Sequence, residues 1–85
     1  MTVRLKQTMY QDLQDDTLWP YIEQLDYPWC HEGEDFVTHP AGSTFTGILF
    51  KGVLEIFIYP NLLDSKLKIY ESILNNKSYI EVLEN

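Results

Sequence analysis

The sequence lacks a second cysteine, which excludes any disulfide bond within the chain. Cys30 is the single cysteine among 85 residues. Small domains that are held together by disulfide bonds need paired cysteines, so this fold depends on its hydrophobic core. A single thiol is also typical of reducing compartments, and we therefore expect a cytoplasmic protein.

Long hydrophobic runs are missing as well. The longest strongly apolar stretch covers residues 53–59 and contains Glu55, whereas a membrane-spanning helix needs about 20 apolar residues. Arg4 and Lys6 are followed by glutamines and aspartates, and not by the apolar segment of a secretory signal peptide. We therefore expect neither a membrane span nor a signal peptide.

Basic residues are few, and the middle of the chain has none. Lysine and arginine together number 6 against 13 aspartates and glutamates, for a formal net charge of −7. Binding to nucleic-acid phosphates or to anionic membranes needs clustered basic side chains, so we expect neither. Residues 7–50 contain no lysine or arginine but eight acidic residues, namely Asp12, Asp15, Asp16, Glu23, Asp26, Glu32, Glu34 and Asp35.

This segregation of charge has two interpretations. Residues 7–50 carry a local charge of −8, whereas the rest of the chain, with 6 basic and 5 acidic residues, carries +1. Like charges on one side of a small domain repel each other, so folding alone does not require the pattern. The acidic segment is either a solvated surface that favours solubility or a face that attracts and docks a basic partner.

The spacing of apolar residues in the first 25 positions predicts an arm or short strand followed by helix. Val3 and Leu5 alternate with basic residues at 1–7. Asp15 begins a possible helix N-cap, and Pro20 interrupts the segment or sits in a first helical turn. We therefore predict one or two short helices between residues 8 and 25, from the helical spacing of Met9, Leu13, Leu18, Ile22 and Leu25.

Residues 26–43 are predicted to form an acidic loop, because prolines and glycines punctuate them. A brief strand at Phe36 and Val37 is the one regular element expected there. Loops of this length inside a compact domain are often functional.

The clearest predicted element is a β-hairpin at residues 44–59. Two runs rich in β-branched and aromatic residues are separated by the two-residue turn Lys51-Gly52. In the second run Leu54, Ile56 and Ile58 share one face, and the other face holds Val53, Glu55, Phe57 and Tyr59. Because both faces carry apolar groups, we expect the hairpin to be central or its second face to meet a partner.

A helix at 61–76 and a strand at 78–84 complete the prediction. Asn61 is a suitable N-cap after Pro60, and Leu63, Leu67, Tyr70 and Leu74 follow at helical spacing. Tyr79 to Leu83 alternate as in a strand. The chain is thus predicted to be a single α+β domain, residues 1–85, in which an antiparallel hairpin and a C-terminal strand pack with the helices.

No trustworthy catalytic or cofactor motif is present. Cys30, His31 and His39 could bind a metal only with the help of a carboxylate, and the closely spaced ligand pairs of structural zinc sites are missing. A Cys–His nucleophile pair lacks support from an orienting group or an oxyanion hole. We predict no metal, no cofactor and no enzymatic activity, with a small cysteine or metal enzyme as the weakest alternative.

Two aromatic residues stand out within the acidic segment. Tyr27 and Trp29 lie in the predicted loop between Asp26 and Glu32. They either pack in the core or serve as interface anchors, since aromatic residues ringed by charge are common at protein interfaces.

These features favour a small acidic inhibitor or adaptor that binds a basic protein surface. A nuclease or nucleic-acid-binding complex is the natural target, because the acidic face can mimic the phosphate backbone. An immunity protein paired with a toxic nuclease and a phage anti-defence protein of the anti-CRISPR type both fit this description. The predicted partner-binding residues are Asp12, Asp15, Asp16, Glu23, Asp26, Tyr27, Trp29, Glu32, Glu34 and Asp35.

The alternative is a non-catalytic structural or assembly subunit. It would use the apolar hairpin face, especially Phe57 and Tyr59, to pack against another chain or to form a homodimer. High salt would weaken an acidic interface but spare an apolar one.

Overall fold

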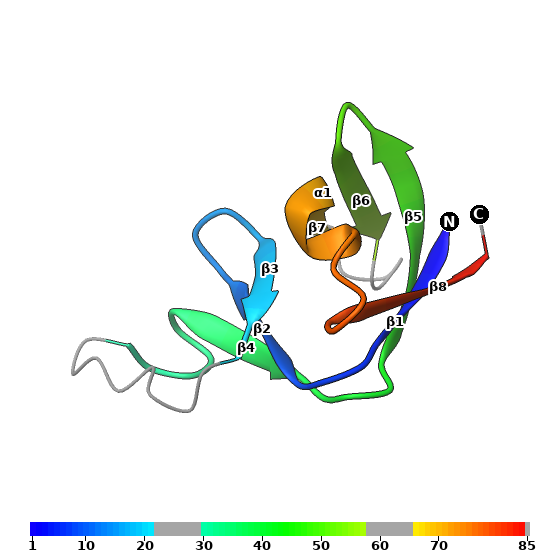
Figure 1. Cartoon of the computed structure of the whole chain (residues 1–85). Helices are drawn as coiled ribbons and strands as arrows, with labels where there is room; N and C mark the ends of the chain where they lie inside the picture. Colours follow the sequence, from blue (N-terminus) through cyan, green and yellow to red (C-terminus); the bar gives the residue numbers. More distant parts are fainter. Residues whose placement is uncertain (22–29, 58–65, 85) are drawn as a thin grey trace.

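The computed structural model describes residues 1–21, 30–57 and 66–84, and it corrects the predicted fold class. Over these described residues the protein is mostly β-sheet, with 57% strand and 6% helix, so the α+β prediction is wrong. Its elements, shown in Figure 1, are β1 (Thr2–Leu5), β2 (Met9–Asp12), β3 (Thr17–Pro20), β4 (Phe36–His39), β5 (Thr44–Phe50), β6 (Val53–Phe57), β7 (Lys66–Tyr70), α1 (Glu71–Leu74) and β8 (Ile80–Glu84).

The strands form one mixed sheet in the order β4-β2-β3-β7-β6-β5-β1-β8. Each neighbouring pair is antiparallel except β3 and β7, which run parallel with Thr17 opposite Lys68. Alternate residues of the strands supply the core, since successive side chains point to opposite faces. The buried core residues are Val3, Leu5, Met9, Leu18, Phe45, Leu54, Ile56, Leu67, Ile69, Ile73, Leu74 and Ile80.

Strand β5 joins two parts of this sheet by changing its partner at Gly47. Before this position β5 pairs with β1, where Thr2 lies opposite Thr46. From Gly47 onward it pairs with β6, where Gly47 lies opposite Ile56. A Cβ atom at Gly47 would overlap the carbonyl oxygen of Glu55 and lie 2.9 Å from Ile56 Cγ1. Only glycine therefore permits this close approach of the two backbones.

The predicted hairpin is confirmed in the described residues. β5 and β6 pair in register from Gly47 and Ile56 to Phe50 and Val53. Lys51 and Gly52 both have positive φ, 52° and 78°, as a type I′ turn requires. The predicted alternation also holds where it is described, because Leu54 and Ile56 are buried while Glu55 is exposed. Residues 58–59 lie outside the described part.

Both terminal strands also form as the alternation predicts. In β1, Val3 and Leu5 are buried and Arg4 is exposed. The predicted strand at 78–84 is β8, which pairs antiparallel with β1.

The predicted helices between residues 8 and 25 are wrong, because residues 8–21 form β2, β3 and their turn. The aspartates expected at a helix N-cap close this turn. Asp16 has a left-handed φ of 61°, which aspartate tolerates better than most residues. Asp12 Oδ1 accepts the Gln14 N–H at 2.9 Å, and Asp15 Oδ1 accepts the Thr17 N–H at 3.2 Å. Residues 22–25 lie outside the described part.

The predicted helix at 61–76 is wrong over most of its described residues, because only four of them are helical. Residues 66–70 form β7, and only Glu71–Leu74 is helical. Leu67 and Ile69 are buried, but Tyr70, which the helical spacing placed on the buried stripe, is 38% exposed. A two-residue period prevails because β7 lies between β6 and β3 inside the sheet. Residues 61–65 lie outside the described part.

The predicted acidic loop at 26–43 contains a strand longer than expected. β4 covers Phe36–His39 and pairs with β2 along its whole length. Residues 26–29 lie outside the described part. No helix in the described ranges is long and apolar enough to cross a membrane.

We predict that Gly47→Ala lowers the free energy of unfolding by about 3 kcal/mol, because the backbone of β6 has no room for the added methyl group. Equilibrium urea denaturation measures this loss. Thr46→Ala is the control, since Thr46 is exposed on the same strand and its loss costs about 0.5 kcal/mol. Equal midpoints for the two variants would show that the close approach at Gly47 does not constrain the fold.

Candidate functional site

Strand pairing brings two acidic segments together at one end of the β4-β2-β3 part of the sheet. β2 and β4 are antiparallel, with Asp12 opposite Phe36. The Leu13 N–H donates to the Asp35 carbonyl oxygen at 3.0 Å, so the β2–β3 turn lies beside the segment that precedes β4. We call this region the acidic end. It contains six of the predicted binding residues, Asp12, Asp15, Asp16, Glu32, Glu34 and Asp35.

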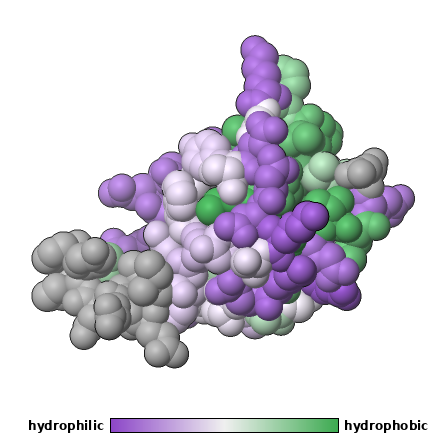
Figure 2. Space-filling model, in the orientation of Figure 1, coloured by the Kyte–Doolittle hydropathy of each residue, from purple (hydrophilic) through white to green (hydrophobic). Residues whose placement is uncertain are grey.

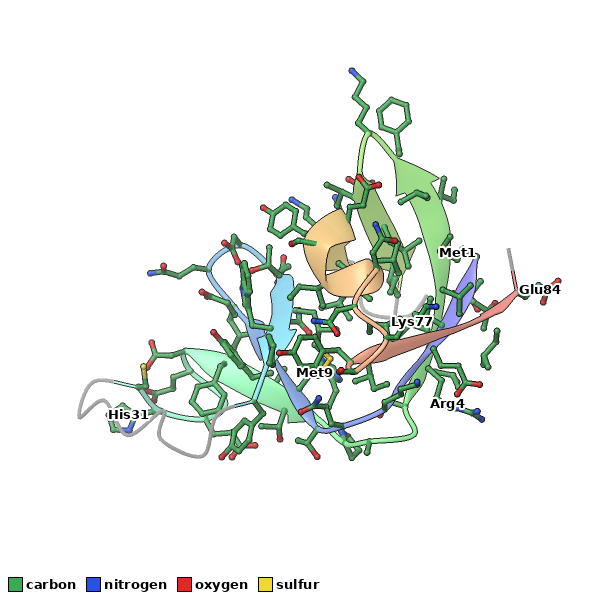
Figure 3. All side chains as sticks on the ribbon, in the orientation of Figure 1. Met1, Arg4, Met9, His31, Lys77 and Glu84 are labelled. Carbon is green, nitrogen blue, oxygen red and sulfur yellow. The ribbon has the colours of Figure 1, made fainter. Side chains whose placement is uncertain are left out.

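No lysine or arginine in the described part of the chain forms an ion pair with the acidic end. Within residues 1–21, 30–57 and 66–84 the ion pair observed joins Arg4 to Glu81 at 2.7 Å, between β1 and β8. Figure 3 shows Arg4 and Glu84 on the opposite side of the view from His31, which lies within the acidic end. The six carboxylates therefore carry negative charge that these basic residues do not neutralise.

Several of these carboxylates are held in place by hydrogen bonds. Asp12 and Asp15 accept the backbone bonds of the β2–β3 turn described above. Asp35 Oδ2 accepts the His31 N–H at 2.8 Å, and Glu32 Oε1 accepts the Thr38 hydroxyl at 3.0 Å. Each bond uses one carboxylate oxygen, so the group is fixed while its other oxygen keeps capacity for a further donor.

Four predicted binding residues lie outside the described part of the chain. They are Glu23, Asp26, Tyr27 and Trp29. Their part in partner binding stays a prediction.

A row of aromatic rings crosses the sheet on the face that also carries Asp12. Tyr10 lies opposite Trp19 on β2 and β3, and the Trp19 and Tyr70 ring centroids are 6.0 Å apart. Tyr70 lies opposite Val53, which lies opposite Phe50. At the other end, the rings of Tyr10 and Phe36 meet edge-on with centroids 6.1 Å apart. We call Phe36, Tyr10, Trp19, Tyr70, Val53 and Phe50 the aromatic row.

The aromatic row is most exposed at the hairpin. Phe50 is 65% exposed and Tyr70 38%, and the neighbouring Ile48 is 68% exposed. Figure 2 shows hydrophobic atoms gathered over the hairpin end of the molecule. None of the rings is among the residues predicted to bind a partner. Tyr10 and Asp12 are two positions apart in the sequence, and so are Thr17 and Trp19. Because residues two apart in a strand share a face, this spacing is the sequence signal that could have placed the rings and Asp12 together.

Hydrogen bonds connect the aromatic row to the acidic end. Trp19 Nε1 donates to Thr17 Oγ1 at 2.6 Å, and Thr17 Oγ1 donates to Asp15 Oδ1 at 2.6 Å. Asp12 lies opposite Thr17 on one side and Phe36 on the other. The rings are therefore linked to the carboxylates through the buried Thr17 and lie next to Asp12 on the same face.

The buried side-chain amide of Gln11 is hydrogen-bonded to the acidic end. Gln11 is only 6% exposed, and its Nε2 donates to Asp16 Oδ1 at 3.2 Å and to the Lys66 carbonyl oxygen at 3.0 Å. Its Oε1 must then accept from His39 Nε2, 2.9 Å away. Burial lowers the pKa of His39, whose ring also meets Phe45 edge-on. This network ties β2, β4, β7 and the acidic turn together.

The structure does not bring Cys30, His31 and His39 together as ligands for a metal ion. His39 is engaged with Gln11, His31 is exposed, and Cys30 is a half-buried free thiol. Among the described residues, no group of three or more histidines, cysteines, aspartates and glutamates could hold a metal ion.

Comparisons of the chain with protein-family models, with curated proteins and with solved structures found no significant match. The charges, contacts and exposure of its own side chains are therefore the basis for assigning a function.

The lowered pKa of His39 predicts how stability depends on pH. In the unfolded chain the pKa of His39 returns to its ordinary value of 6.5. At pH values between the folded-state pKa and 6.5, the unfolded chain therefore binds more protons than the folded protein does. The free energy of unfolding therefore falls as the pH drops through this interval. Above and below the interval, the contribution of His39 to the free energy of unfolding does not change with pH.

Urea denaturation between about pH 7.5 and about pH 5 tests this dependence. We expect the decline to be shallower in His39→Gln and unchanged in His31→Gln, whose histidine is exposed. Identical pH profiles for the wild type and His39→Gln would contradict the prediction.

Proposed function

We propose that this protein is a small binding inhibitor that covers the basic surface of a nuclease or of another nucleic-acid-binding protein. One observation carries the proposal. The pairing of β2 with β4 gathers six carboxylates at the acidic end, and no lysine or arginine in the described ranges pairs with them. Such a concentration of negative charge complements a surface that holds phosphates.

The mechanism is occlusion without chemistry. A nucleic-acid-binding groove exposes lysine and arginine side chains for phosphate oxygens, and the carboxylates of the acidic end compete for the same donors. Since turn hydrogen bonds already fix several of these carboxylates, less side-chain freedom is lost on binding. The net charge of −7 speeds the encounter with a basic partner at low salt.

Two biological settings suit this mechanism. One is an immunity protein that neutralises a toxic nuclease, and the other is a phage protein of the anti-CRISPR type that disarms a bacterial defence complex. A cytoplasmic location is part of the proposal, because the single cysteine suits a reducing compartment.

A structural subunit that self-associates is the second candidate. The exposure of Ile48 and Phe50, 68% and 65%, favours it. Tyr59 and the side chain of Phe57, which were predicted for that interface, lie outside the described part. Two copies would each bring a net charge of −7, and this repulsion opposes association, so we favour the basic partner.

Three isosteric substitutions at the acidic end test the proposal. Asp16→Asn, Glu32→Gln and Glu34→Gln remove charge while keeping size and a hydrogen-bond acceptor. The control variant removes the same charge elsewhere through Glu71→Gln, Glu81→Gln and Glu84→Gln. Tagged forms of both variants and of the wild type are used to recover partners from lysate, and binding is then measured with the purified captured protein.

We expect the wild type and the control variant to bind a basic nucleic-acid-binding protein at about 0.05 M salt. At about 0.5 M salt most of this bound partner should be released. The acidic-end variant should bind about tenfold more weakly than the control variant. Equal affinity of the two variants, or binding that persists in high salt, would contradict the proposal.

A further inference from the structure

The aromatic row has no role in the occlusion mechanism, yet it borders the acidic end. Its six residues, five of them aromatic, span six neighbouring strands from β4 to β5 through the pairings described above. Phe50 and Tyr70 keep large exposed fractions, 65% and 38%. Exposed aromatic side chains next to charge are typical of the anchors in protein interfaces.

One ring on this surface, that of Phe50, already meets a cation. Lys51 Nζ lies 5.3 Å from the centroid of the Phe50 ring, within the range of a cation–π interaction. In the next row of side chains Glu55 lies opposite Lys68, so opposite charges balance there. The acidic end supplies the excess negative charge at the border of the row.

A second copy of this chain is a poor occupant for this surface. It would bring its own net charge of −7, with its own acidic end next to its own aromatic row. Pairing the two faces would place like charges side by side. A basic partner complements both the carboxylates and the electron-rich faces of the rings.

We propose that the aromatic row is the docking face for an arginine-rich segment of the basic partner, an inference that rests on the proposed function. A guanidinium group can stack flat on an aromatic ring and donate two parallel hydrogen bonds to a carboxylate. A lysine ammonium group has the same charge but lacks this planar geometry. Stacking on the rings therefore gives a preference for arginine over lysine that is larger than the carboxylates of the acidic end give alone.

Two peptides of equal length and charge, nona-arginine and nona-lysine, test the inference. Their affinities are measured by NMR titration of the isotope-labelled full chain. We expect nona-arginine to bind about tenfold more tightly than nona-lysine. It should also shift the indole signal of Trp19 and the backbone signals of Phe50 and Tyr70.

A variant that carries Phe50→Leu and Tyr70→Leu removes two rings but keeps apolar side chains on the strands. We expect it to lose most of the preference for arginine and to keep its affinity for nona-lysine. The matched control carries Val82→Ala and Leu83→Ala, which change exposed apolar residues on β8. It should keep the preference.

Three results would overturn the inference. The first is equal affinity of the wild type for the two peptides, with shifts confined to the acidic end. The second is a preference for arginine that is undiminished in the double leucine variant. The third is a homodimer, seen by light scattering, that Phe50→Leu dissociates. The proposed function stands even if the preference fails, provided that the variant with Asp16→Asn, Glu32→Gln and Glu34→Gln binds nona-lysine more weakly than the wild type does. No binding of either peptide would contradict both the inference and the proposed function.

Discussion

The close approach of β5 and β6 at Gly47 is the constraint on which the rest of the structure depends. A side chain at this position would overlap the Glu55 carbonyl oxygen. Because the backbones can come together, one strand pairs first with β1 and then with β6. The β6-β7-β3-β2-β4 part of the sheet is thereby joined to the terminal strands. This part carries the acidic end and, together with Phe50 on β5, the aromatic row.

Several acidic residues of the acidic end have structural roles. Asp12 and Asp15 close the β2–β3 turn, and Asp35 and Glu32 bind groups within their own segment. These duties explain why acidic residues stand at these positions. They do not explain why no basic residue in the described part pairs with them. The proposal of a basic partner is based on these carboxylates that lack an ion pair.

Local patterns in the sequence were enough to predict the hairpin and both terminal strands, because turn residues and two-residue alternation are local signals. They failed at β7, where the spacing of Leu67, Tyr70 and Leu74 fits a helix and only burial within the sheet selects the strand. The acidic residues were recognised from charge. Their meeting, and the contact of Trp19 with Tyr70, depend on pairings between distant strands that no local pattern specifies.

Occlusion is tested most directly by competition on the purified partner. A labelled oligonucleotide is bound to the captured protein, and this chain is added stepwise while the fraction of bound oligonucleotide is followed by fluorescence anisotropy. The acidic surface is expected to displace the oligonucleotide completely at about one equivalent, since both ligands need the same basic side chains. A stable complex that contains the partner, the oligonucleotide and this chain together would contradict occlusion.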